Sequence, residues 1–297
     1  MQDQVYRYLA ADGNVRIALA QTTMAAEEAS RIHNATPVAA AAMGRTLTMA
    51  LLLASELKGD GSVSVSVAGG GPIGKVIAVA RPDGAVKVYC SNPSVDLPPR
   101  PDGKLDVGGA VGRQGKLAVV KDLGMREPYI GQVNLVTGEI GEDFALYLAA
   151  SEQQPSLAAL GVLVSQQGPV LSAGGIVVQP LPGCPEETLS HLELIAPTLG
   201  DISRRLLDEG PDGVIQSTFR GMDPKRIGEM PVELKCDCSR DRIERALISL
   251  GGNELADMIQ EEGNAEVRCH FCARAYDFTA EELGELRDQA EKGSEGE

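Results

Sequence analysis

Four of the six cysteines form two close pairs near the end of the chain. One residue separates Cys236 from Cys238, and about 30 residues further on two residues separate Cys269 from Cys272. Thiolates are soft ligands, and each close pair can supply two neighbouring corners of a tetrahedral zinc site. The spacing therefore predicts one zinc ion held by Cys236, Cys238, Cys269 and Cys272, a closed shell that leaves His270 out.

The same four cysteines could also respond to oxidants. A Cys-x-Cys pair is less usual than Cys-x-x-Cys in a structural knuckle, and its sulfurs are close enough to form an oxidised pair. The segment from Pro231 to Glu297 carries 17 acidic and 8 basic residues, and a unit this small buries little apolar surface. Metal removal should therefore unfold it. Because oxidants attack thiolates, oxidation and unfolding would be coupled, which makes a metal-held switch a reasonable hypothesis.

The elements that must position these cysteines fall into three parts. Residues 1–179 alternate strand-like and helical patterns, which predicts an N-terminal α/β core domain. Residues 180–231 are rich in proline, with short amphipathic patterns near Glu186–Ile195 and Asp201–Asp208, which predicts a helical linker. Residues 232–297 are predicted as a small zinc-binding domain. The fold class is therefore α+β.

Local signals in the last part predict how the cysteines are held. Two short strands flank the second cysteine pair, near Glu266–Cys269 and Ala275–Phe278. Ser239 and Asn253 are predicted to cap helices, and Thr279 with Glu282 fits a capping box. We expect the pair Cys269 and Cys272 to lie in a turn between the strands.

Composition limits the classes of function. The chain of 297 residues has a net charge of −15, with 3 % aromatic residues and no tryptophan, which argues against nucleic-acid and membrane-surface partners. The start of the sequence does not resemble a signal peptide. The apolar stretch Pro37–Ser55 contains Arg45 and is predicted as a buried helix, so a cytoplasmic location is expected.

No catalytic site is predicted. The stretch from Gly69 to Lys75 resembles a phosphate-binding loop, but Val76 stands where serine or threonine is needed, and a turn between strands is expected. The three histidines lie outside any nucleophile motif. Cys90 and Cys184 fall outside the paired pattern and are interpreted as incidental thiols.

At the level of whole segments the chain resembles the 33-kDa chaperonin (heat-shock protein 33) family of bacterial redox-regulated holdase chaperones. The resemblance extends over nearly the whole chain. Besides the four cysteines, it is carried by residues 115–122, 127–131, 137–140, 151–153, 174–175, 179–182, 239–245 and 250–252.

The resemblance implies an ATP-independent holdase that binds unfolding client proteins during oxidative stress. It implies a reduced, inactive form with zinc on the four cysteines. Oxidation would form the disulfides Cys236–Cys238 and Cys269–Cys272, release zinc, and unfold the C-terminal unit and linker. The active form would be a homodimer.

Two other functions stay open. A thiol–disulfide oxidoreductase could use Cys269 and Cys272, although such a motif is expected at a helix N-terminus that follows a strand. A structural zinc ribbon could instead dock on a larger complex. Sustained turnover of a disulfide substrate would favour the enzyme, whereas binding to nucleic acid at low salt would favour the ribbon.

Overall fold

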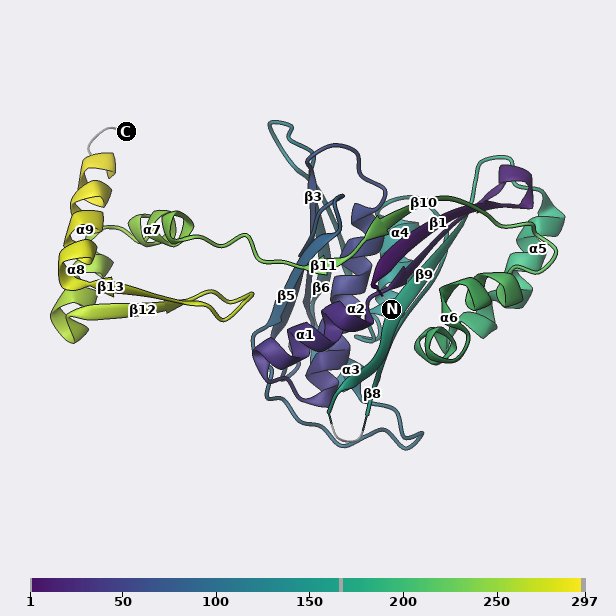
Figure 1. The fold of residues 1–297 in the computed structure, drawn as a ribbon, viewed down its shortest axis with the longest axis horizontal. Coiled ribbons are helices and arrows are strands. Elements are labelled where there is room, and N and C mark those ends of the chain that lie inside the picture. The colour runs from purple at the N-terminus through teal and green to yellow at the C-terminus, as the bar shows by residue number, and fades with distance from the viewer. Residues whose placement is uncertain (1, 166–167, 295–297) are drawn as a thin grey trace. The chain divides into compact units, whose positions relative to one another are not determined.

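Helix α2 (Pro37–Ala54) is buried along nearly its whole length in this computed structural model, which describes residues 2–165 and 168–294 (Figure 1). The Thr36 side chain accepts a hydrogen bond from the Ala39 N–H at 3.4 Å, and Pro37 occupies the first turn, so the start of the helix is well specified. The helix is long and apolar enough to cross a membrane, but 89 % of it is buried inside the structure. It is a core helix, as the sequence predicted.

Two antiparallel sheets lie on either side of α2 (Figure 1). In the first, the alternation of serine and valine places Val63, Val65 and Val67 on the buried face. Its order is β11-β5-β4-β3-β6-β7, with only the β11–β5 pair parallel. The strands are β3 (Ser62–Ala68), β4 (Lys75–Ala80), β5 (Ala85–Cys90), β6 (Lys116–Asp122), β7 (Tyr129–Asn134) and β11 (Glu233–Leu234).

The second sheet packs its other face against helices from later in the chain. Its order is β10-β1-β2-β9-β8, with antiparallel pairs throughout. The strands are β1 (Gln4–Ala10), β2 (Val15–Gln21), β8 (Leu157–Val164), β9 (Val170–Pro180) and β10 (Lys225–Pro231). Between the sheets lie α1 (Thr23–His33), α2, α3 (Val107–Val111) and α4 (Gly141–Ala150).

Helices α5 (Glu186–Ile195) and α6 (Ile202–Thr218) cover the outer face of this second sheet (Figure 1). Helix α6 is longer than the predicted Asp201–Asp208 because it continues past a kink at Gly210 and Pro211. Its buried side chains include Leu206, which packs over β9. The helices need this sheet, since short amphipathic helices are marginal by themselves.

The last part of the predicted helical linker is a strand. Residues 225–231 form β10, paired with β1, so the expectation of a helical linker over 180–231 is wrong for this stretch. The proline-rich, charged sequence hides the strand because its partner is supplied by the distant N-terminus. The turn expected from Gly69 to Lys75 is confirmed between β3 and β4.

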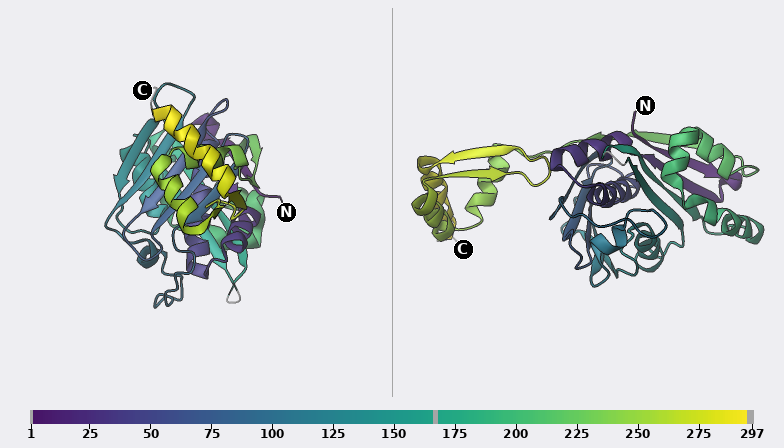
Figure 2. Two further views of the ribbon diagram at one scale, coloured as in Figure 1. Left: turned by 90° about the vertical axis from the view of Figure 1, so that its left-hand side faces the viewer. Right: turned by 90° about the horizontal axis from the view of Figure 1, so that it is seen from below.

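The cysteine-bearing residues form a second, much smaller unit. The structure divides into Met1–Lys235 and Cys236–Glu297, whereas the three-part division into 1–179, 180–231 and 232–297 stays a prediction. Figure 2 shows the hairpin and helices of the second unit in green to yellow. Its elements are α7 (Arg240–Ile248), α8 (Gly252–Glu262), β12 (Asn264–Arg268), β13 (Ala275–Thr279) and α9 (Ala280–Ser294).

The predicted caps of this small unit are mostly confirmed. The Ser239 hydroxyl accepts from the Arg242 N–H at 3.3 Å, and Thr279 and Glu282 form the capping box. The Asn253 cap is wrong: α8 begins at Gly252, two residues earlier than that cap implies, after Gly251, whose φ of +95° suits glycine. The apolar cluster is small: among the described residues its buried members are Leu247, Leu255, Ala265, Phe278, Leu283 and Leu286, and seven partly buried side chains pack against them.

Candidate metal centre

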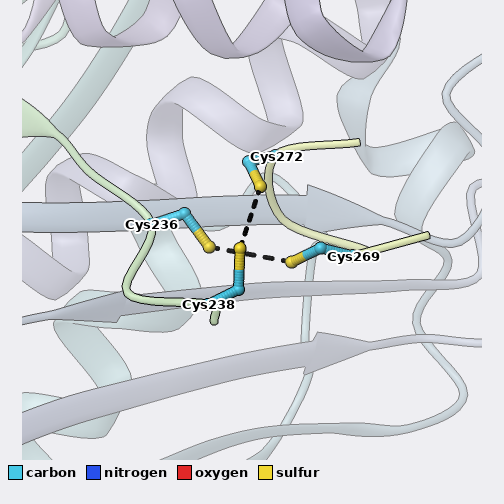
Figure 3. A group of neighbouring side chains, drawn as sticks. All are labelled: Cys236, Cys238, Cys269 and Cys272. Atoms are coloured by element: carbon cyan, nitrogen blue, oxygen red, sulfur yellow. Dashed lines mark hydrogen bonds between the residues drawn. The ribbon is translucent and has the colours of Figure 1, made fainter. Parts of the chain in front are cut away.

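The four predicted cysteines converge on one point (Figure 3). Their sulfur atoms all lie within 4.8 Å of one another. The Sγ atoms of Cys236 and Cys269 are 3.7 Å apart, and those of Cys238 and Cys272 are 3.4 Å apart. A zinc ion with Zn–S bonds of 2.3 Å needs sulfurs about 3.8 Å apart, so the cluster has the size of a tetrahedral thiolate site.

Two different loops present the sulfurs. Cys236 and Cys238 lie in the extended segment before α7, and Cys269 and Cys272 lie in the turn between β12 and β13, as predicted. In that turn the Cys269 N–H donates to the Arg274 carbonyl at 3.0 Å, and the Ala273 N–H donates to the Cys269 carbonyl at 2.9 Å. The hairpin therefore fixes the second pair, while the first depends on the position of α7.

Hydrogen bonds onto sulfur suit thiolates rather than thiols. The backbone N–H groups of Cys238 and Arg274 are directed at the sulfurs of Cys236 and Cys272. Tyr276, which sequence reasoning missed, donates its hydroxyl to the Cys238 Sγ at 3.2 Å. The position of Tyr276 in the sequence does not indicate this contact, because the contact depends on how the folded hairpin places the ring beside Cys238.

The pKa values of the Cys236, Cys238 and Cys272 thiols are shifted in different directions. Burial raises the pKa of Cys238, but the hydrogen bonds from Tyr276 and the neighbouring thiols outweigh it and lower the pKa to about 7. Burial raises the pKa of Cys236 and Cys272. Binding of a cation would displace the protons of these two half-buried thiols, because metal ligands must be thiolates.

Two arginine side chains connect the helices and strands of this unit around the cysteine cluster. Arg240, also missed from the sequence, lies over the Phe278 ring at 4.3 Å. It donates to the Asp277 carbonyl at 3.0 Å and to Glu282 at 2.6 Å. Arg242 pairs with Asp237, which lies between the first two cysteines. These contacts join α7 to β13 and α9 and help to hold Cys236 and Cys238 beside the hairpin.

The other two cysteines lie away from the cluster. All six are free thiols in this structure. Cys90 is buried at the end of β5, where burial raises its pKa to about 11, and it has the character of an inert core residue. Cys184 is half-buried before α5. The oxidoreductase interpretation expected Cys269 at a helix N-terminus, whereas this residue lies in a hairpin turn.

Comparisons with known proteins agree with the site. The family model described as Hsp33 protein matches residues 3–279. The 33 kDa chaperonin of Desulforamulus reducens is 45% identical over 98% of this chain and 99% of its own, and that of Bacillus subtilis is 45% identical over 97% and 99%. A crystal structure of the 33 kDa chaperonin from Thermotoga maritima superimposes with a TM-score of 0.89, at 35% identity, over 98% of this chain and 100% of that one. The chain therefore belongs to the Hsp33 family of chaperones.

Proposed function

We propose that this protein is an ATP-independent holdase of the cytoplasm whose client binding is controlled by oxidation of a zinc-thiolate centre. In the reduced form Cys236, Cys238, Cys269 and Cys272 hold one zinc ion and the protein is inactive. The observation that carries the proposal is the joining of a four-sulfur cluster to a unit with a very small apolar core. Such a unit depends on its metal.

Oxidation would remove the ligands of the metal. In each pair two thiolates give two electrons to one peroxide molecule, an S–S bond forms, the O–O bond breaks, and two protons from solvent complete two waters. We assign the disulfides to Cys236–Cys238 and Cys269–Cys272, because each pair lies within one short loop and can close without the other. No thiolate then remains to hold zinc.

Unfolding of the second unit would destabilise the linker that precedes it. The second unit begins at Cys236, directly after a segment that pairs with both sheets. Helices α5 and α6 cover apolar residues of β1, β2 and β9. When the linker unfolds, this face becomes available to the apolar segments of unfolding clients, and two oxidised chains assemble as a homodimer. The named relatives are chaperonins, which supports a binding role rather than catalysis.

The test follows zinc and client in one sample. The reduced protein is treated with mild peroxide at a gently raised temperature, while a chelating dye reports free zinc and light scattering reports the aggregation of a chemically unfolded client. We expect zinc release and suppression of aggregation to rise together. Retained zinc, or zinc release without protection, contradicts the proposal.

A matched variant separates the switch from other thiols. Cys184→Ser removes a half-buried thiol outside the cluster and should leave both signals unchanged. Peptide mapping of the oxidised protein tests the pairing directly, because the cross-pairs Cys236–Cys269 and Cys238–Cys272 would yield different linked fragments. Sustained turnover of a disulfide substrate would instead indicate an oxidoreductase.

A further inference from the structure

One short segment closes both sheets of the first unit. Residues 225–235, here called the edge strap, contain β10 and β11 (Figure 1). Strand β10 is the edge strand and pairs with β1 from Gln4–Pro231 to Leu9–Lys225, and β11 pairs with β5. Between them the Val232 N–H donates to the Asp3 carbonyl at 3.0 Å. The strap therefore caps two sheet edges and leads directly to Cys236.

The strap is held mainly through its backbone. Within β10 only the Met230 side chain is buried, and Ile227 is 55 % exposed. The ladder is interrupted by a bulge between Arg7 and Tyr8, and β11 has two residues. A strand bound in this way is recognised chiefly by its hydrogen-bonding groups rather than by its sequence.

One strap side chain covers aromatic surface on β1. The Arg226 guanidinium lies 4.7 Å from the centre of the Tyr6 ring and 5.6 Å from that of Tyr8. It also donates to the Tyr8 hydroxyl at 3.2 Å and pairs with Asp212 of α6. Removal of the strap therefore takes the cation away from two tyrosine rings and leaves the edge of β1 unpaired.

We propose that the edge of β1, once the strap has left, binds an extended segment of an unfolded client as an added antiparallel strand in the place of β10. This inference rests on the proposed function, since it needs the linker to be released. The strap shows what the edge accepts: an extended chain with a cation over Tyr6 and Tyr8 and an apolar side chain in the place of Met230. The strap of a second oxidised chain is the competing occupant, and the exchange experiment below distinguishes it from a client.

Backbone pairing explains how one edge could serve many clients. Unfolded chains share amide groups but no common sequence, so a site that uses main-chain hydrogen bonds discriminates by extension and not by side chain. The native ladder from Gln4 to Leu9 shows that the edge can pair with a segment of this length. The uncovered edge of β1 would recognise the backbone of a client, whereas the apolar face under α6 would contact apolar side chains.

Hydrogen exchange on the full-length protein tests the occupancy of β1. Amides of β1 are followed in the reduced protein, in the oxidised protein, and in the oxidised protein with reduced, carboxymethylated α-lactalbumin as a permanently unfolded client. We expect protection in the first state, loss in the second, and at least about tenfold slower exchange on client addition, the signature of restored pairing. Amides of the central strand β9 serve as the internal reference.

A peptide copy of the strap tests backbone recognition. The peptide of residues 225–232 should compete with the client for the oxidised protein. Two further peptides carry N-methyl groups, one at Glu229 and the other at Gly228 and Met230. Because neighbouring amides of a strand point to opposite sides, one methylated peptide should compete normally and the other should lose about fivefold or more in affinity, since each lost hydrogen bond is worth about 1 kcal/mol.

The outcomes separate this inference from the proposed function. If aggregation is suppressed while β1 stays protected after oxidation, or stays unprotected when client binds, clients bind elsewhere and the inference is overturned. Equal loss in both methylated peptides also overturns it. Protection of β1 by a second oxidised chain without client would assign the edge to the dimer. Absence of any suppression of aggregation contradicts the proposed function itself.

Discussion

The two units of this chain are stabilised in different ways. The first buries a continuous apolar core between two sheets, built around α2. The second has a small apolar cluster, an acidic surface and four sulfurs within 4.8 Å. Burial stabilises in proportion to apolar area, so the first unit can hold itself together and the second needs a cross-link. A metal cross-link made of thiolates is one that oxidants can remove.

Removal of the metal should produce the largest difference between the units. Zinc binding to small thiolate domains is worth about 10–16 kcal/mol, which exceeds what so small an apolar cluster can replace. Cys269→Ser should therefore lower zinc affinity and abolish amide protection in the second unit, while β9 keeps its protection. Zinc content and hydrogen exchange measure both effects. Unchanged zinc content in the variant would refute the four-thiolate site, and Cys184→Ser is the control.

A core truncation in each unit sharpens the comparison. Phe278 and Phe144 are both fully buried, and either change to alanine costs about 3–5 kcal/mol. Phe278→Ala also removes the ring under Arg240, and it should make zinc release by peroxide faster and at lower temperature. Phe144→Ala should lower the melting temperature of the first unit and leave zinc release unchanged. Equal rates of zinc release in the two variants would show that the metal alone sets the barrier.

The linker can be weakened without touching the metal. The Leu206 side chain of α6 is buried, whereas that of its neighbour Leu207 is 45 % exposed. Leu206→Ser should cost about 2–5 kcal/mol of linker stability and raise client protection before full oxidation. Leu207→Ser should behave as wild type. A Leu206→Ser protein as inactive as the reduced wild type would show that α6 takes no part in the switch.

A substitution beside the edge strap should have a smaller effect on amide exchange. Gly84 has a φ of +86°, and a Cβ there would lie 1.6 Å from the Pro231 carbonyl oxygen. Gly84→Ala should push the strap away from β5 and increase amide exchange in β1 and β5. Gly103→Ala is the matched control, since Gly103 has a φ of +78° with no atom within 4 Å of the added carbon. Equal exchange in the two variants would show that backbone strain, and not the strap, is responsible.

The sequence predicted what local patterns encode. The cysteine spacing predicted the four-sulfur cluster because both close pairs are local features, and α5 matches the predicted Glu186–Ile195 because its amphipathic pattern is local too. It missed β10, whose partner β1 lies more than 200 residues away and whose own pattern is charged. It missed Tyr276 and Arg240 for the same reason, because their contacts depend on how α7 and the hairpin pack. Long-range pairing leaves little trace in a single sequence.

The smallest expected effect comes from one hydroxyl in the metal centre. Tyr276→Phe removes the donor to Cys238, whose pKa of about 7 lies below the ordinary thiol value because that bond and the neighbouring thiols stabilise the thiolate. A hydrogen bond to a charged group is worth about 1.5–3 kcal/mol, so the pKa should rise by about one unit or more. Because thiolates bind zinc, the folded variant should lose its metal at a slightly higher pH as the zinc-bound protein is acidified, and a chelating dye measures this release. An unchanged pH of zinc release would assign the low pKa to the neighbouring thiols rather than to Tyr276.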